Sequence, residues 1–346
     1  MKTVTLGKTG LVVSRIGFGG IPITRRAFDE AVSVVRRGLD LGITFIDTAN
    51  GYLDSEEKIG RAIAGRRDGL VLASKSGAST RQGILEHIDL SLRRLRTDYL
   101  DLYQLHNLSR PESWQTISGP GGALEGLRAA KEGGKVRHIG VTSHSLDVAE
   151  TLLEADCFET VMLPFNVITH EAEEKLLPLA RAANVGFIAM KPMAGGELED
   201  PDLPIRWLCQ FEDVQVLVGF ERDEEVDEVV ALARAEKPLT EEELQEVERI
   251  RRERGGLFCR RCGYCQPCPQ GIPITNVMVF RSFMKRFGPA VAARRFGVGI
   301  EKAAECLDCG ECEEKCPYQL PVRERMKEIL AVYQSIVAGT YRDEAT

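Results

Sequence analysis

The sequence predicts an α/β fold, in which a closed barrel of eight parallel strands alternating with helices precedes a small cysteine-rich helical domain. Eight short runs rich in Val, Ile and Leu recur from Ile16 to Val216, which is 200 residues in seven steps. The mean step of about 29 residues is the length of one βα unit. Eight such units over about 230 residues fit a (β/α)8 barrel of the TIM type better than an open sheet. Eight of the ten cysteines lie in the last quarter of the chain.

The barrel elements follow one another in order along the chain. Residues 4–6 and 11–13, joined by the turn 7–10, predict a hairpin that closes the lower end of the barrel. The eight strands are centred near Ile16, Ile46, Val71, Tyr103, Ile139, Met162, Ile188 and Val216. Helical patterns, with apolar residues three and four apart, cover residues 28–41, 56–64, 84–95, 123–132 and 172–183.

The boundary between the two domains is predicted from a helix end. Thr240 and Glu243 form a capping box, which indicates the start of a helix that reaches about residue 254. Gly255 and Gly256 end this helix, and the cysteine-rich segment begins at Cys259. We therefore expect the barrel domain over residues 1–254 and the cysteine-rich domain over residues 255–346.

Composition excludes several classes of partner. The chain has 52 acidic residues against 45 Lys and Arg, a net charge of −7, so no basic excess exists for nucleic acid. No uncharged apolar stretch of about 18 residues occurs, which predicts neither a membrane span nor a signal peptide. We expect a cytoplasmic protein with no nucleic-acid or membrane partner. In a reducing cytoplasm, closely spaced thiols indicate metal binding rather than disulfides.

Four residues with catalytic side chains fall at successive strand ends of the predicted barrel. They are Asp47, Tyr52, Lys75 and His106. Catalytic groups of this architecture lie at the carboxyl ends of the strands. The motifs around them are D-T-A-x-x-Y-x-x-S-E from residue 47, the strand ending at Lys75, and Y-L-D-L-Y-x-L-H from residue 99. With G-V-T-S-H at 140–144 and M-K-P-M-A-G-G at 190–196, residues 1 to about 250 resemble the aldo-keto reductases.

The resemblance implies hydride transfer between NAD(P)H and a small-molecule carbonyl substrate. Reduction of a carbonyl needs a proton donor for the developing alkoxide, and Tyr52 is the implied general acid. An ammonium close to a phenol favours the phenolate, which is the implied role of Lys75, and Asp47 keeps Lys75 charged. His106 is expected to donate a hydrogen bond that orients the substrate oxygen.

The resemblance also implies residues that contact the nucleotide. Thr142, Ser143 and Asn166 are the candidates for holding the nicotinamide amide. Met190 stands where a tyrosine often stacks on the nicotinamide, and a methionine sulfur also packs well on an aromatic ring.

The segment after the eighth strand departs from the family pattern. We expect Gly219, Phe220, Arg222 and Glu228 to border the cofactor there. Family members that select the 2′-phosphate of NADPH carry a Lys and an Arg, and their places are taken here by Gly219 and Glu225. A carboxylate repels a phosphate, and only Arg222 offsets it. The sequence therefore favours NADH, or weak selectivity between the two nucleotides, over strict use of NADPH.

The cysteine-rich tail carries two runs with the spacing of iron–sulfur ligands. The runs are Cys259, Cys262, Cys265 and Cys268, followed by Pro269, and Cys306, Cys309, Cys312 and Cys316, followed by Pro317. The second run has the bacterial ferredoxin spacing for [4Fe–4S] clusters, in which the fourth cysteine serves the other cluster. By this resemblance one cluster is held by Cys259, Cys262, Cys265 and Cys316, and the other by Cys306, Cys309, Cys312 and Cys268. The alternative is a pair of structural zinc sites, for which three cysteines at three-residue intervals are poorly suited.

The 37 residues between the two runs indicate helices at 274–286, 289–296 and 300–307. This link resembles the α-helical type of ferredoxin domain more than the compact β-rich type. The whole chain is thus similar to aldo-keto reductases that carry a two-cluster iron–sulfur tail.

Three hypotheses for the combined function follow. In the first, the barrel transfers hydride while the clusters exchange electrons with a partner, a separate electron-transfer protein. In the second, the clusters are structural or sense oxygen, and in the third the chain is a nicotinamide-binding redox sensor without turnover. Nicotinamide delivers two electrons as hydride whereas a cluster passes one at a time, and the sequence has no flavin motif that would couple them.

Overall fold

The computed structural model describes residues 1–342 and divides the chain into two compact units. The barrel unit is Met1–Glu248 and the helical unit begins at Arg249. The long helix α10, Glu241–Arg254, runs across this division, which therefore lies six residues before the boundary expected at residue 254. The capping box at the start of α10 is present, because the Thr240 N–H donates to Glu243 Oε2 at 2.8 Å and the Glu243 N–H donates to Thr240 Oγ1 at 3.3 Å.

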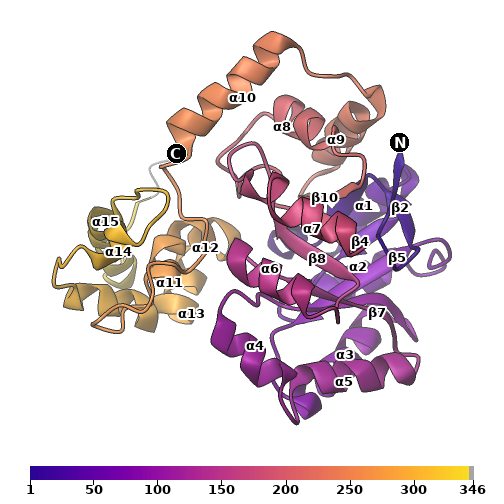
Figure 1. The fold of residues 1–346 in the computed structure, drawn as a ribbon, viewed down its shortest axis with the longest axis horizontal. Helices are drawn as coiled ribbons and strands as arrows, with labels where there is room; N and C mark the ends of the chain where they lie inside the picture. The colour runs from indigo at the N-terminus through magenta and orange to yellow at the C-terminus, as the bar shows by residue number, and fades with distance from the viewer. Residues whose placement is uncertain (343–346) are drawn as a thin grey trace. The chain divides into compact units, whose positions relative to one another are not determined.

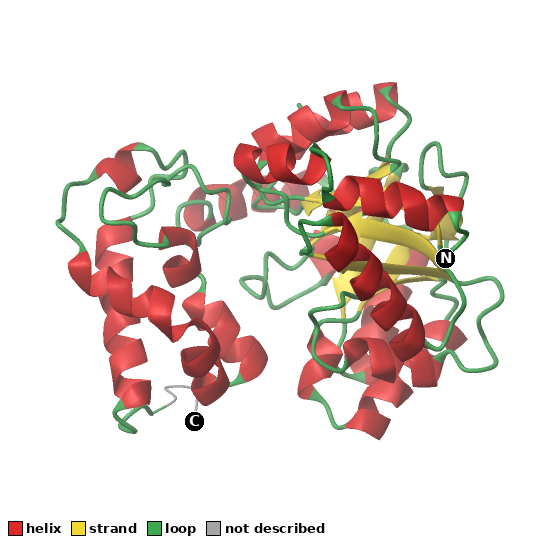
Figure 2. Ribbon diagram, turned by 90° about the horizontal axis from the view of Figure 1, so that it is seen from below, coloured by secondary structure: helices red, strands yellow, loops and turns green. Residues whose placement is uncertain are grey.

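The barrel unit is a closed (β/α)8 barrel, as the sequence predicted. Its eight parallel strands are hydrogen-bonded in the order β10-β3-β4-β5-β6-β7-β8-β9. Figure 2 shows these strands enclosed by helices. The strands are β3 Ile16–Gly19, β4 Phe45–Asp47, β5 Val71–Ser76, β6 Leu100–Leu105, β7 Val136–Thr142, β8 Thr160–Pro164, β9 Gly186–Met190 and β10 Val214–Gly219.

The expected hairpin precedes the barrel, with β1 Thr3–Thr5 antiparallel to β2 Val12–Ser14 near the N-terminus (Figure 1). Val4, Leu6 and Val13 are buried in one cluster with inward-facing side chains of six barrel strands. The hairpin thus closes the amino-terminal end of the strands with apolar side chains, which leaves the carboxyl end for polar chemistry.

Helices follow the strands as the apolar periodicity indicated. They are η1 Pro22–Arg25, α1 Phe28–Asp40, α2 Ser55–Ala62, α3 Arg81–Leu95, α4 Pro111–Ser118, α5 Ala123–Glu132, α6 Leu146–Glu154, η2 Glu171–Glu173, α7 Leu176–Ala182, α8 Asp202–Leu208 and α9 Asp223–Ala235. The helix expected over 172–183 is divided into η2 and α7. The helices α4, α6 and α8 were not among the predicted ranges, and α4 lies in the long connection after β6.

The helical unit is built from helices and loops, with no strand among its described residues (Figure 2). It contains α11 Ile274–Met278, α12 Phe280–Phe287, α13 Pro289–Glu301, η3 Lys302–Glu305, α14 Glu311–Glu314 and α15 Val322–Val337. The single helix expected over 274–286 is broken at Val279. The buried residues of this segment are three positions apart, whereas an α-helical turn takes 3.6 residues. In one continuous helix they would therefore drift around its surface, and the break keeps all four on the buried side. They are Ile274, Val277, Phe280 and Phe283.

Two other predicted helices of the link differ in length. The helix expected to end at residue 296 continues to Glu301. Within this extension Gly297 packs directly on Tyr333 of α15, where a Cβ would lie 2.6 Å from the phenol oxygen. The helix expected over 300–307 is reduced to the short η3. Across residues 1–342, none of the helices is both long enough and apolar enough to cross a bilayer.

Candidate functional site

The carboxyl ends of the barrel strands bring the four expected catalytic residues to one end of the barrel. Asp47 is the last residue of β4, Lys75 is the next to last of β5, and His106 directly follows β6. Tyr52 lies in the turn between β4 and α2. Since β4, β5 and β6 are adjacent parallel strands, their ends deliver these side chains to the same place.

Lys75 and Asp47 form a buried ion pair, each residue being 2% exposed. The Lys75 Nζ donates to the Asp47 carboxylate and, at 2.8 Å, to the carbonyl of Thr48. The same Nζ lies 5.1 Å from the centre of the Tyr52 ring. The ammonium is therefore held between a carboxylate and a phenol.

Gln104, on β6, completes the environment of this pair. Its Nε2 donates to Asp47 Oδ2 at 2.9 Å, and its side chain is fully buried. Sequence reasoning did not single out this residue. The available signal was strand alternation, because Gln104 lies two residues before His106 and therefore on the same face of the strand.

The ionised form of Lys75 is favoured by its neighbours. Burial alone disfavours the ammonium, but the Asp47 carboxylate and the Tyr52 phenol outweigh that cost and raise the pKa of Lys75 above its ordinary value. Lys75 accordingly supplies a permanent positive charge beside the Tyr52 ring at neutral pH.

His106 and Tyr52 face each other across the mouth of the barrel. Their ring centres are 5.7 Å apart and their planes are inclined at 79°. Both side chains are partly exposed, in contrast to the buried Asp47 and Lys75. The two accessible groups are thus those expected to contact a substrate, and the two buried groups support them.

The turn that carries Tyr52 is fixed by backbone hydrogen bonds. The Tyr52 N–H donates to the Ala49 carbonyl and the Asn50 N–H donates to the Lys75 carbonyl, each at 2.9 Å. Arg94 of α3 donates to the Asn50 carbonyl at 3.1 Å. The position of Tyr52 relative to Lys75 is therefore set by the backbone on both sides of the turn.

The candidates for the nicotinamide amide lie at the ends of β7 and β8. Thr142 and Ser143 are buried, and their hydroxyls bond to nearby backbone, Thr142 Oγ1 with the Asn107 N–H at 2.8 Å and Ser143 Oγ with the Ser145 carbonyl at 3.0 Å. Asn166 donates to the Lys191 carbonyl at 2.9 Å and accepts from the two N–H groups of residues 168 and 169. These three side chains brace the loops of the site. Met190, the last residue of β9, is partly buried and packs against the apolar cluster inside the barrel.

At the end of β10, two of the expected cofactor contacts differ in exposure. Gly219 is exposed and closely approached by Pro22, so that an added Cβ would lie 2.8 Å from the proline ring. Phe220 is fully buried, and its ring packs on Phe18 with centres 5.3 Å apart. Its side chain therefore belongs to the apolar core, and only its backbone stands at the strand end.

The start of α9 is occupied by carboxylates. Glu225 Oε2 accepts the N–H groups of Glu221 and Arg222 at 2.8 and 3.3 Å, and Glu225 Oε1 accepts from Arg222 Nε at 3.0 Å. Glu221 pairs with Arg25. Both arginines are thus neutralised by neighbouring glutamates, and Glu228, one turn further along α9, is exposed.

The eight clustered cysteines of the helical unit line two cavities. Cys259, Cys262, Cys265 and Cys316 line the first, together with Arg260 and Tyr318. This cavity is narrow, about 20 Å³. The buried Arg260 stacks on the Tyr318 ring, with its guanidinium carbon 3.7 Å from the ring centre.

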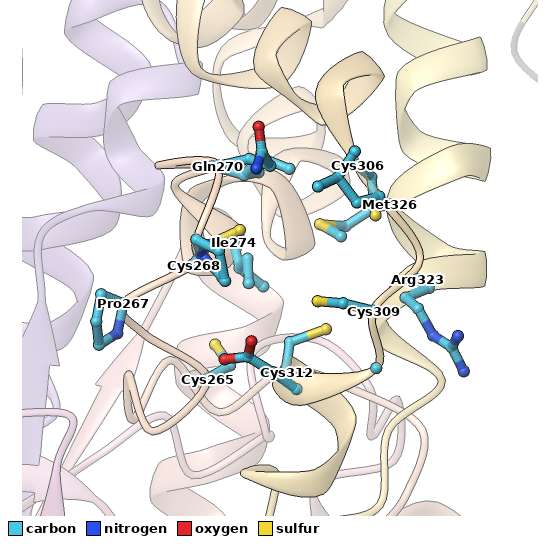
Figure 3. Close-up of a pocket in the computed structure, with 15 residues that line it drawn as sticks. Cys265, Pro267, Cys268, Gln270, Ile274, Cys306, Cys309, Cys312, Arg323 and Met326 are labelled. Atoms are coloured by element: carbon cyan, nitrogen blue, oxygen red, sulfur yellow. The ribbon is translucent and has the colours of Figure 1, made fainter.

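The second cavity, of about 230 Å³, is lined by Cys268, Cys306, Cys309 and Cys312, with Cys265 at its border to the first set. Figure 3 shows Cys268 on the opposite side of this cavity from Cys309, whose sulfur points into the space between them. Arg323 also lines it, with its guanidinium turned outward in the same view.

Burial disfavours the thiolate form of several of these cysteines. It raises the pKa of Cys259 to about 11 and that of Cys265 to about 12, where the neighbouring Cys259, Cys262 and Cys316 add to the effect. The pKa of Cys312 is also raised by burial. Binding of a cationic metal group would therefore displace protons from these thiols.

Two further observations concern metal-binding side chains. Within the described residues 1–342, no three His, Cys, Asp or Glu side chains converge closely enough to hold a single metal ion. Cys157 and Cys209 are partly buried thiols of the barrel unit, away from the clustered eight in sequence.

Comparison with protein families assigns both parts of the chain. Residues 15–203 match the model of the aldo/keto reductase family, and residues 258–321 match that of a 4Fe-4S dicluster domain. Among curated proteins, the chain is 35% identical over 200 residues to the aldo-keto reductase YhdN of Bacillus subtilis, which covers 52% of this chain and 59% of that protein. The match thus spans about three fifths of that relative's length.

Solved structures resemble the barrel unit. The holo form of the aldo-keto reductase AKR11C1 from Bacillus halodurans is 26% identical, with a TM-score of 0.63, and covers 72% of this chain and 96% of its own. An aldo/keto reductase from Klebsiella pneumoniae, in complex with NADP and acetate, is 28% identical with a TM-score of 0.62 and covers 72% and 95%. From its family match, its barrel and its cysteine-rich tail, the chain belongs to the aldo/keto reductase family and carries a C-terminal 4Fe-4S dicluster domain.

Proposed function

We propose that the barrel unit transfers hydride between a nicotinamide nucleotide and a small-molecule carbonyl, with Tyr52 as the general acid. The observation that carries this proposal is the placement of the Lys75 ammonium, which contacts the Asp47 carboxylate and lies 5.1 Å from the Tyr52 ring. When bound, the nicotinamide supplies the hydride. The chain's own residues supply and control the proton.

Each residue of the site has a distinct role in this proposal. Lys75 favours the phenolate that remains when Tyr52 gives its proton to the developing alkoxide. Asp47 keeps Lys75 charged, and Gln104 satisfies the second oxygen of Asp47 so that the buried carboxylate has no unpaired acceptor. His106, which faces Tyr52, orients the substrate oxygen by donating a hydrogen bond.

For the nucleotide, we propose NADH in preference to NADPH. The Klebsiella relative binds NADP, which supports a nicotinamide nucleotide here. Glu221 and Glu225 supply negative charge where a 2′-phosphate would approach, and the arginines beside them are already paired. Thr142, Ser143, Asn166 and Met190 are the proposed neighbours of the nicotinamide ring and amide.

For the helical unit, we propose two [4Fe–4S] clusters that exchange single electrons with a partner protein. The donor sets fit this group, because four thiols line the first cavity and the other four, with Cys265 at their border, line the second. Thiolates are the soft ligands that iron–sulfur clusters take. The first cluster is assigned to Cys259, Cys262, Cys265 and Cys316, and the second to Cys268, Cys306, Cys309 and Cys312. We propose a reducing compartment such as the cytoplasm, because there the eight thiols would not be oxidised to disulfides and could remain metal ligands.

The proposal is tested by the substitution Tyr52→Phe, which removes the acidic proton and keeps the ring. We expect NADH-dependent reduction of small aldehydes to fall by at least about a hundredfold, while NADH affinity, followed by nucleotide fluorescence, stays unchanged. Tyr103→Phe is the matched control, since Tyr103 is a fully buried phenol of strand β6 that alternates to the opposite face of the strand from Gln104. Equal activity of Tyr52→Phe and the control would reject Tyr52 as the acid.

A further inference from the structure

One edge of the helical unit exposes a cysteine of the second ligand set. Cys309 is exposed, whereas the other seven clustered cysteines are partly or fully buried. The neighbouring Leu307 is 69% exposed, although it is a large apolar side chain. Because electron transfer weakens steeply with distance, a cluster held by Cys309 is the one that an outside electron carrier can approach.

The charge of the helical unit is divided between two segments of its sequence. Residues 303–328, which contain Cys306, Cys309 and Cys312, have seven acidic residues against four basic ones, a net charge of −3. Residues 260–302 have eight Lys and Arg against one Glu, a net charge of +7. The segment that exposes Cys309 is therefore acidic, in contrast to the strongly basic segment before it.

Part of the acidic charge near Cys309 is not compensated. Three carboxylates of the segment are paired, Asp308 with Lys327 at 2.8 Å, Glu311 with Lys315 at 3.0 Å and Glu313 with Arg323 at 2.7 Å. Glu305 and Glu314 are exposed and have no ion pair within the part of the chain that the structure describes. Along the sequence, these two carboxylates stand on either side of the apolar Leu307 and the exposed Cys309.

We propose that this surface, formed by Glu305, Leu307, Cys309 and Glu314 and here named the Cys309 edge, docks a protein electron carrier. The carrier that fits it has an accessible one-electron centre surrounded by Lys and Arg side chains. The inference rests on the proposed cluster at Cys268, Cys306, Cys309 and Cys312. In the exchange, one electron would pass between the carrier's centre and the cluster held by these four cysteines, so that one is oxidised as the other is reduced, with no bond broken and no proton moved.

Complementary charge is the argument for a basic carrier. An acidic rim steers a basic protein to the surface, and the attraction weakens as salt is added. An exposed apolar centre within a polar rim is the usual arrangement of a protein interface. The basic segment of a second copy of this chain is the competing occupant, and the test below separates the two.

The test uses anaerobic holoprotein and mitochondrial cytochrome c, a strongly basic one-electron acceptor. Binding is measured by calorimetry with ferrous cytochrome c, so that no electron moves, and electron transfer is measured by stopped flow after reduction of the clusters. We expect binding and a rate that both fall with rising salt. The anionic acceptor ferricyanide should show the opposite salt dependence.

Substitutions locate the effect on the surface. Glu305→Lys with Glu314→Lys is expected to weaken cytochrome binding and slow transfer about tenfold or more, with unchanged iron content. Glu132→Lys with Glu154→Lys makes the same charge change on the exposed ends of α5 and α6 and should leave both quantities nearly unchanged. Leu307→Ser should weaken cytochrome binding without slowing electron transfer to ferricyanide.

The opposite results would overturn the assignment. Suppose that protein with full iron content shows a transfer rate and a cytochrome affinity that change neither with salt nor with Glu305→Lys and Glu314→Lys. The Cys309 edge would then not be the docking surface, although the clusters would still be present. A holoprotein dimer that sedimentation velocity detects and that Glu305→Lys with Glu314→Lys dissociates would assign the edge to a second copy instead. Protein without iron would reject the cluster proposal itself, and the edge with it.

Discussion

The buried pair of Lys75 and Asp47 needs a third residue, because a carboxylate withdrawn from water requires a partner for each oxygen. Lys75 bonds to one side of Asp47, and Gln104 donates to Oδ2 at 2.9 Å. Without Gln104, the negative charge on Asp47 is less well stabilised. The charged form of Lys75, which that carboxylate favours, is then less well stabilised too.

The substitution Gln104→Leu should therefore lower kcat/KM for carbonyl reduction by about tenfold, the effect of leaving one buried charged group unsatisfied. Nucleotide affinity should be unchanged. Gln215→Leu is the control, since Gln215 is equally buried but lies in β10 and bonds to the Val216 carbonyl. If both variants lost activity equally, a general loss of packing rather than support of Asp47 would be the cause.

Nucleotide preference is also decided by single residues. Glu225→Gln removes a negative charge from the start of α9 and keeps an oxygen that can accept the N–H groups of Glu221 and Arg222. We expect the ratio of kcat/KM for NADH to that for NADPH to fall by about three- to tenfold, because a carboxylate near a 2′-phosphate is repulsive. The comparison variant is Glu228→Gln on the next turn of α9, and a ratio that responds to neither would place the 2′-phosphate elsewhere.

Single residues also mark the limit of what the sequence predicts. Asp47, Tyr52, Lys75 and His106 could be identified because strand ends and motifs coincide. Gln104 could not, since a lone polar residue within an apolar strand gives no sign of the carboxylate that it meets two strands away. The ring of Phe220 lies in the core rather than at the surface because a residue after a strand end can face either way.

At the scale of elements, the eight strands and the closing hairpin were predictable because each carries a short apolar run with regular spacing. The helices of the cysteine-rich tail were less predictable, and the break at Val279 and the extension of α13 to Glu301 show why. Contacts with α15, such as that of Gly297 with Tyr333, decide where these helices end, and a single sequence does not reveal such contacts.

The loops and helices that carry the cysteines provide a test at the same scale. Cys306→Ser should lose roughly half of the bound iron, about four atoms per chain, while NADH binding to the barrel is unchanged. Cys309→Ser, at the exposed position, tests the same ligand set with less disturbance of packing. Cys157→Ser, in the barrel unit, should retain all iron, and iron content that is equal in all three variants would show that the second ligand set is misassigned.

At the scale of the whole molecule, one chain joins two units with different electron chemistry. The barrel places the Tyr52 phenol beside the Lys75 ammonium, the arrangement from which we propose hydride transfer. The helical unit places eight thiols in two sets around two cavities. Nicotinamide moves two electrons together and a cluster moves one, so the two units need not share electrons directly. The Cys309 edge offers the clusters a route to a separate carrier.

Everything proposed for the helical unit depends on the presence of both clusters in a chain that also has a reductase barrel. The most direct test is the metal and acid-labile sulfide content of protein purified without oxygen. Two clusters predict about eight iron and about eight sulfide per chain, with a broad visible absorbance. About two zinc ions per chain, with no sulfide, would contradict the account.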